Sequence, residues 1–209
     1  MKKVYVLLIM LLVFISNNSF SQDAKAQTKP KTKPALLVID IQNAYLPMVP
    51  DREKEIAMQY INALIELFHA HGYPVICVYN LDKESGPQEN TEAFQFPTSV
   101  VSKPDDAKVI KTYGDGFNKT DLEKILKANG SNTLFLCGLS AVGCVLATYV
   151  GAQNHDYQAF LVKNAIMSHN SDYTKNVEDM FDAVGYDVVK LIVEKKLSYS
   201  RKTNWNKVN

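Results

Sequence analysis

The feature that most constrains this chain is a series of short, continuously apolar runs, each followed by a turn or a charged residue. Strands that are apolar on both faces are typical of parallel sheets, because helices cover both sides of such a sheet. Segments with a helical spacing of apolar residues separate the runs. The runs are Ala35–Asp40, Pro74–Tyr79, Ala107–Lys111, Thr133–Cys137, Gln158–Val162 and Asp187–Val193. This pattern predicts a Rossmann-like, three-layer αβα fold with a six-stranded, mostly parallel sheet.

The predicted helices lie between these strands. Apolar residues recur with helical spacing from Ile56 to His71, and Gly72 ends that stripe. Further helices are expected at Thr120–Asn129, Val145–Asn154 and Asn176–Val184. The 209 residues are enough for one α/β domain and few for two. We therefore predict a single domain over residues 35–209.

The N-terminus has the pattern of a secretory signal. Two lysines precede the apolar run Val4–Ile15, and the small residues Ser19 and Ser21 follow it. This order predicts a signal peptide over residues 1–21. The apolar run is shorter than the ~20 residues that cross a bilayer, so no stable membrane insertion is expected after signal cleavage. A retained membrane anchor is the alternative.

The polar segment 22–34, rich in Lys, Thr and Ala, is expected to be a disordered tether between the signal and the domain. The protein is therefore predicted to be exported, and to be periplasmic or secreted. Lys and Arg number 23 against 22 Asp and Glu, so no basic excess points to a nucleic acid. The glycine-rich motifs of dinucleotide and nucleoside triphosphate sites are absent, and so is the Gly-x-Ser-x-Gly of serine hydrolases.

Chemistry-bearing residues follow several of the predicted strands. Ligands of open parallel sheets bind at the carboxyl ends of the strands, where Asp40, Lys111 and the segment Gly138–Cys144 are expected to lie. Each residue alone has an ordinary interpretation: an Asp that turns the chain, a solvated surface Lys, and a Cys that packs. Exposed strand-end charges contribute little to stability, so replacing them is expected to leave folding little changed.

Three segments together resemble the isochorismatase-like cysteine hydrolase family. They are Ala35–Asn43 (ALLVIDIQN), Val109–Phe117 (VIKTYGDGF) and Leu136–Val145 (LCGLSAVGCV). The resemblance extends from about Pro34 to Val193, and the family's fold is a parallel sheet flanked by helices. It implies hydrolysis of a small molecule and self-association into a homo-oligomer.

The resemblance also implies the residues of the site. A triad of Asp40, Lys111 and Cys144 would act with an oxyanion hole formed by the backbone amides of Ser140 and Cys144, after a cis peptide bond between Leu139 and Ser140. Family members that cleave the vinyl ether of isochorismate generally lack the Cys, so its presence favours an amide or a related acyl substrate. Members with a metal carry histidines that the segment 79–85 lacks. We therefore expect no metal and no cofactor.

The chemistry agrees with this assignment. A thiol at the start of a helix lies at the positive end of the helix dipole, and Lys111 is a second positive charge, so the pKa of Cys144 is expected to be lowered. Asp40 can accept the thiol proton, and unpaired amides at the helix start can hold an oxyanion. Gln42 and Phe117 are weaker candidates for substrate binding.

We therefore predict an exported cysteine hydrolase that cleaves a small amide or related C–N bond through an acyl-enzyme on Cys144. Two alternatives remain open. The loop Ser140–Gly143 departs from the usual family sequence, so the protein could be a catalytically silent ligand-binding protein of the same fold. Cys137 and Cys144 could instead form the disulfide of a thiol redox sensor. In the absence of such a disulfide, Cys77 and Cys137 are interpreted as buried packing residues.

Overall fold

A computed structural model describes residues 31–181 and 183–195. The predicted signal peptide and most of the predicted tether lie outside the described residues. The elements run in the order β1 (Pro34–Ile39), η1 (Leu46–Met48), α2 (Asp51–Ala70), β2 (Val75–Asn80), η2 (Glu92–Phe94), β3 (Ala107–Lys111), α3 (Leu122–Ala128), β4 (Thr133–Leu139), α4 (Cys144–Asn154), β5 (Gln158–Met167), α5 (Ser171–Met180) and α6 (Tyr186–Lys195), where η denotes a short 3-10 helix.

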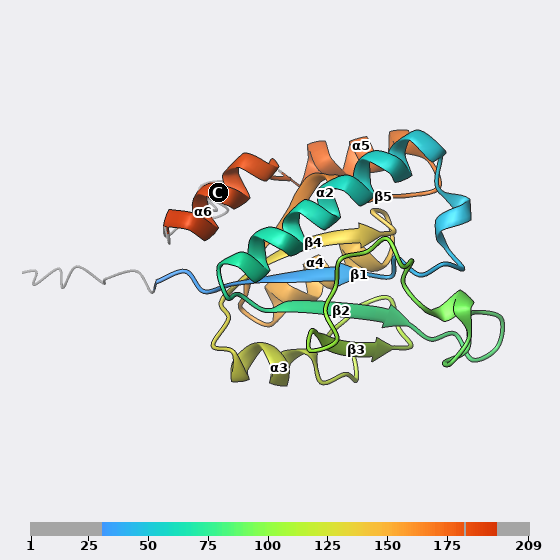
Figure 1. The fold of residues 1–209 in the computed structure, drawn as a ribbon, viewed down its shortest axis with the longest axis horizontal. Coiled ribbons are helices and arrows are strands. Elements are labelled where there is room, and N and C mark those ends of the chain that lie inside the picture. The colour runs from blue at the N-terminus through green and yellow to red at the C-terminus, as the bar shows by residue number, and fades with distance from the viewer. Residues whose placement is uncertain (1–30, 182, 196–209) are drawn as a thin grey trace, which may run out of the picture. The chain divides into compact units, whose positions relative to one another are not determined.

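The five strands form one parallel sheet in the order β3-β2-β1-β4-β5 (Figure 1). The chain first adds strands on one side of β1 and then crosses to the other side, so the strand order reverses between β1 and β4. The carboxyl ends of these two strands are where an open parallel sheet binds its ligands. The predicted α/β fold with a parallel sheet is confirmed.

The prediction of a sixth strand at 187–193 is wrong, because these residues belong to the helix α6. Val189, Ile192 and Val193 are buried, whereas Val188 and Leu191 are 38% and 42% exposed. This spacing is that of one helical face. The β-branched composition of the segment favours a strand, but burial of its helical stripe in the core determines the structure.

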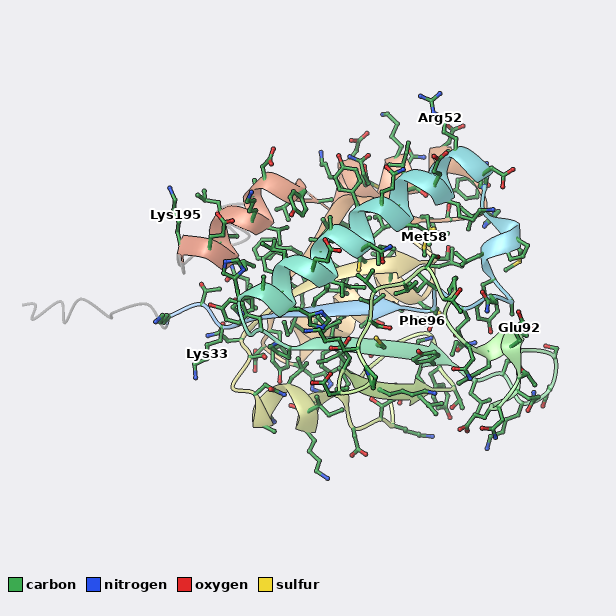
Figure 2. The ribbon with its side chains drawn as sticks, viewed as in Figure 1. Lys33, Arg52, Met58, Glu92, Phe96 and Lys195 are labelled. Carbon is green, nitrogen blue, oxygen red and sulfur yellow. The ribbon has the colours of Figure 1, made fainter. Side chains whose placement is uncertain are left out.

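Helices cover both faces of the sheet (Figure 1). The long helix α2 and the helix α6 bury their apolar residues in one core cluster, and α3, α4 and α5 contribute to a second cluster on the opposite face. Figure 2 shows charged side chains such as Lys33, Arg52 and Lys195 pointing away from the sheet. This two-sided burial explains why the strands are apolar at almost every position.

The irregular segment between β2 and β3 also packs onto the domain. Phe94 and Phe96 stack on Tyr79, with ring centroids 5.3 and 4.2 Å away. The backbone amides of Asn43 and Ala44 bond to carbonyl oxygens of this segment, both at 2.9 Å. The segment therefore supports the loop that follows β1.

The domain begins earlier than residue 35. Pro34 is already part of β1, and the amide of Lys33 donates to Asn132 Oδ1 at 2.9 Å. The last residues of the predicted tether are thus held against the loop before β4. Among the described residues, no helix is both long and apolar enough to cross a membrane.

Candidate active site

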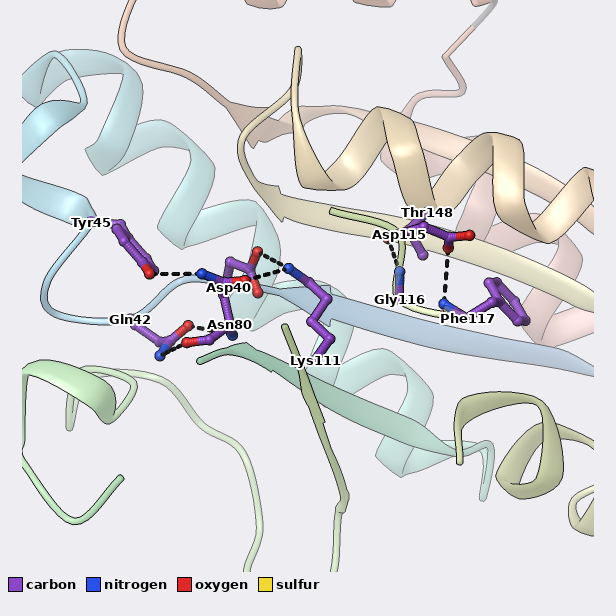
Figure 3. A network of polar contacts seen from close by, with 9 residues as sticks. All are labelled: Asp40, Gln42, Tyr45, Asn80, Lys111, Asp115, Gly116, Phe117 and Thr148. Atoms are coloured by element: carbon purple, nitrogen blue, oxygen red, sulfur yellow. Dashed lines mark hydrogen bonds and ion pairs between the residues drawn. The ribbon is translucent and has the colours of Figure 1, made fainter. Parts of the chain in front are cut away.

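Asp40 and Lys111 meet at the carboxyl end of the sheet (Figure 3). Asp40 directly follows β1, and Lys111 is the last residue of β3, two strands away. The Lys111 side chain crosses the end of β2 to reach Asp40, and its Nζ lies 2.7 Å from Asp40 Oδ2. The same Nζ donates to Oδ1 of Asn80, which ends β2, at 3.2 Å.

This ion pair is buried. The side chains of Lys111 and Asp40 are 0% and 4% exposed. The interpretation of Lys111 as a solvated surface charge is therefore wrong, and so is the basis for expecting its replacement to leave folding unchanged. A buried pair is costly to break, because removing one partner leaves an uncompensated charge in the interior.

Asp40 has an unusual backbone and one free oxygen. Its φ of 53° lies in the left-handed region, which few residues other than glycine adopt. The carboxylate Oδ1 is buried and has no hydrogen-bond partner. Burial raises the pKa of Asp40, and the Lys111 charge opposes that rise. Backbone strain and an unpaired carboxylate oxygen are concentrated at functional sites.

Cys144 is the first residue of α4 and is partly buried. Burial raises the pKa of its thiol to about 11, the charge of Asp40 adds to the rise, and Lys111 opposes it. The expectation of a lowered thiol pKa is therefore wrong, because desolvation outweighs the nearby lysine. At neutral pH Cys144 is therefore a protonated thiol, which would need a proton acceptor before it could act as a nucleophile.

The loop between β4 and α4 sets Cys144 in place. Gly138 has a φ of +114°, and a Cβ there would lie 2.1 Å from the carbonyl oxygen of Ile39. Only glycine allows β4 to approach β1 this closely, directly before Asp40. The cis peptide bond between Leu139 and Ser140, which the family resemblance implied, is present.

Several amides of this loop have no hydrogen-bond partner. The amides of Ala141, Gly143 and Val145 donate to backbone carbonyls, but within residues 31–181 and 183–195 no partner is found for those of Ser140, Val142 and Cys144. The two amides predicted for the oxyanion hole, those of Ser140 and Cys144, are thus among the unpaired ones. The Ser140 hydroxyl is also buried and without a partner.

A cavity of about 230 Å³ opens beside these groups. Three of the predicted residues, Asp40, Ser140 and Cys144, contribute to its wall. The remaining lining residues were not predicted from the sequence and are Tyr45, Met48, Asn80, Leu139 and His169.

Two of these additional residues follow the same rule as the predicted ones. Asn80 ends β2, and His169 comes shortly after β5, so both lie at the carboxyl edge where ligands bind. Tyr45 lies between β1 and η1, and Met48 is the last residue of η1, in a part of the chain with no periodic signal. Asn80 also links the site together, because its Nδ2 donates to the Tyr45 hydroxyl at 2.9 Å (Figure 3).

Gln42 and Phe117 lie outside the cavity lining. The fully buried Gln42 side chain bonds to the backbone of Asn80, accepting from its N–H at 2.8 Å and donating to its carbonyl at 3.0 Å. Phe117 stacks on His155, with ring centroids 4.8 Å apart. Gln42 thus holds Asn80 in place, and Phe117 anchors the loop after β3 against α4. No grouping of three or more His, Cys, Asp or Glu side chains suited to a metal ion occurs in the described part of the chain.

Comparison with known proteins identifies the family. The model of the isochorismatase domain matches residues 34–191. The chain is 32% identical to an uncharacterized isochorismatase family protein of Bacillus subtilis (strain 168) over 136 residues, which are 63% of this chain and 76% of that protein. It is 30% identical to the maleamate amidohydrolase of Pseudomonas putida over 95 residues, 45% of this chain and 44% of that enzyme.

Solved structures show the same fold. The N-carbamoylsarcosine amidase of Thermoplasma acidophilum superposes with a TM-score of 0.63 at 24% identity, over 74% of this chain and 95% of that one. The match of the domain model extends over well more than half of the sequence and spans every strand of the sheet. The chain therefore belongs to the isochorismatase family and is an isochorismatase-like hydrolase.

Proposed function

We propose that this hydrolase cleaves a small carboxamide through a thioester intermediate on Cys144. The observation that carries the proposal is one cavity lined by the Cys144 thiol residue, by Asp40 with its unpaired carboxylate oxygen, and by a loop that has unpaired amides. A nucleophile, a base and an oxyanion site are the parts that acyl transfer requires.

In the first half of the reaction, Cys144 Sγ attacks the carbonyl carbon of the amide and its proton moves to Asp40. The raised pKa of Asp40 favours its holding that proton. The amides of Ser140 and Cys144 stabilise the oxyanion. When the tetrahedral intermediate collapses, the C–N bond breaks and Asp40 returns the proton to the departing amine, which leaves a thioester.

In the second half, water attacks the thioester carbonyl and gives a proton to Asp40. The C–S bond breaks, the carboxylic acid is released, and the proton returns to the thiol. Lys111 does not touch the substrate in this scheme, because its side chain is fully buried. It compensates the charge of Asp40 each time that carboxylate loses its proton.

The similar proteins support an amide substrate. One is named a maleamate amidohydrolase, and a structure of the same fold is named an N-carbamoylsarcosine amidase. Both names describe cleavage of a C–N bond, which agrees with the presence of a cysteine at the start of α4.

The redox-sensor alternative receives no support from the geometry. Cys137 packs in the core cluster on the α2 face of the sheet, whereas Cys144 packs against the cluster on the opposite face. Cys137 Sγ contacts the carbonyl oxygen of Leu37 at 3.4 Å, and burial raises its pKa. A disulfide requires two Cβ atoms that face each other at close range.

The test is a panel of small amides with acid quenching and mass spectrometry. We expect turnover of at least one amide and an acyl adduct on the peptide that contains Cys144. Turnover with no adduct in wild type, or binding of amides with no turnover, would contradict the proposal; the second result would favour the silent binding protein.

We further propose that the protein is exported and forms a homo-oligomer. Mass spectrometry of the protein from its native host should find an N-terminus near Gln22, and an intact Met1 would contradict export. Light scattering at micromolar concentration should report more than one copy of the chain, and a strict monomer would contradict self-association.

A further inference from the structure

The residues that line the cavity beside Cys144 include one hydrogen-bond acceptor and one potential donor that lack partners. Two of its lining residues, Asp40 and Ser140, each hold a buried polar atom without a partner, the carboxylate oxygen Oδ1 and the hydroxyl oxygen Oγ. The first accepts a hydrogen bond, and the second can donate one to a carbonyl. A primary carboxamide supplies the matching N–H and C=O groups, whereas a carboxylate near Asp40 would meet a like charge.

The rest of the wall carries no fixed positive charge. No arginine or lysine is among the described residues that line the cavity. The nearest lysine, Lys111, is 0% exposed at its side chain and is already paired with Asp40. A buried anion without a partner is strongly disfavoured, so the wall rejects an acyl group that bears a carboxylate.

The remaining surface and the size of the cavity define the acyl group. Tyr45, Met48 and Leu139 give the wall its apolar side. Because a cavity of about 150 Å³ holds one benzene ring, a cavity of about 230 Å³ holds roughly nine non-hydrogen atoms. From these features, and resting on the proposed function, we infer that the substrate is a small, uncharged primary amide with a mainly apolar acyl group. The carboxylate-bearing substrate for which the maleamate amidohydrolase is named falls outside this class.

The test compares two amides of equal size that differ in one charge. Levulinamide ends in a methyl ketone, and succinamate ends in a carboxylate with the same number of non-hydrogen atoms. We expect kcat/KM of the wild-type protein to be at least about 100-fold higher for levulinamide. Equal turnover of the two amides, or a preference for succinamate, would overturn the inference while leaving the proposed amidase function intact.

Two substitutions identify the source of the preference. Met48 lines the cavity and is 58% exposed, so an arginine there can place its charge at the mouth without being buried. Met48→Arg is expected to narrow the ratio of the two kcat/KM values at least about tenfold, whereas the neutral control Met48→Gln keeps it. His169→Gln should keep the preference as well; efficient turnover of succinamate by the wild type that is lost in His169→Gln would overturn the inference.

Binding separates this inference from catalysis. Calorimetry with Cys144→Ala should detect levulinamide binding and much weaker succinamate binding, whether or not any amide is turned over. Succinamate binding as tight as that of levulinamide would overturn the inference. A clear binding preference with no turnover in the wild type would instead overturn the proposed function alone.

Discussion

The chemistry of single residues in this site depends on how burial distributes protons between Asp40 and Cys144. Burial raises the pKa of both groups, so the site favours a protonated thiol and a carboxylate that readily accepts a proton. Lys111 opposes both shifts from a fully buried position. The sequence places these residue types at the right strand ends, but it cannot show that desolvation outweighs the lysine, because burial depends on the packing of the whole domain.

Asp40→Asn should have opposite effects on alkylation and on turnover. The charge of Asp40 contributes to the raised thiol pKa of about 11, so its removal should lower that pKa and speed alkylation of Cys144 by iodoacetamide near neutral pH. The same variant cannot accept the thiol proton, so amide turnover should fall by about 10²- to 10⁴-fold. Alkylation rates are measured across pH with mass spectrometry, and Cys77, whose pKa burial raises to about 12, is the internal control. Slower alkylation together with unchanged turnover would contradict the assigned role of Asp40.

Lys111→Met should destabilise the fold, by about 3–5 kcal/mol at neutral pH, because it leaves a buried carboxylate uncompensated. Since the folded-state pKa of Asp40 is raised, the carboxyl contributes stability at low pH that is lost as pH rises through that pKa, and removing Lys111 extends this loss. The loss of stability of Lys111→Met relative to wild type should therefore grow from acid to neutral pH. Thermal unfolding of Lys111→Met and of the double variant with Asp40→Asn measures it. The double variant should recover most of the stability; a single variant as stable as wild type at neutral pH would contradict a buried pair.

At the scale of secondary-structure elements, the approach of β4 to β1 holds the two halves of the site together. Gly138 lies beside Ile39 in the sheet, and a Cβ would collide with the backbone of β1. Gly138→Ala should lower the free energy of unfolding by about 3 kcal/mol or more. Gly114→Ala is the matched control, because a Cβ there would make only an ordinary contact at 3.6 Å. Chemical denaturation compares the two variants, and equal stability would contradict the close approach of the strands.

The elements also show where sequence patterns succeed. The strand predicted at Ala107–Lys111 has those bounds in the structure, because an apolar run between turn residues has few alternatives. The helix α5 begins at Ser171, capped by Asn170, rather than at Asn176. The strand β5 continues to Met167 through an irregularity at Asn164, whose φ is 61°. Polar residues mask both boundaries, so hydrophobic periodicity alone does not detect them.

At the scale of the whole molecule, the reversal of strand order between β1 and β4 brings the site together. Asp40, Lys111 and the loop before Cys144 were predictable because each ends or follows a strand, and Asn80 and His169 satisfy the same rule. Tyr45 and Met48 were not predictable, because they lie in an irregular segment whose position depends on contacts with the residues between β2 and β3. Topology therefore determines which residues meet at the site, and loop packing determines which residues lie opposite them.

Activity of the whole protein should survive the removal of metal ions. The cavity wall offers a carboxylate already paired with Lys111, a thiol and one imidazole, and these do not form a ligand group within the described residues. Metal sites need clustered ligands and partners that orient them. Dialysis against a strong chelator should leave amide turnover unchanged. Loss of turnover that zinc restores would contradict this prediction.

The central claim is that Cys144 forms the covalent intermediate, and turnover by Cys144→Ala tests it most directly. The variant removes the nucleophile and leaves the Asp40–Lys111 pair, so it should fold like wild type and show no amide turnover above background. Cys77→Ala is the matched control, because Cys77 is buried in the core on the α2 face and should not affect the chemistry. Both variants are assayed with the best amide of the panel, and thermal unfolding confirms their folding. Abolished turnover in Cys144→Ala alone is the predicted result, and wild-type turnover in Cys144→Ala would contradict the account.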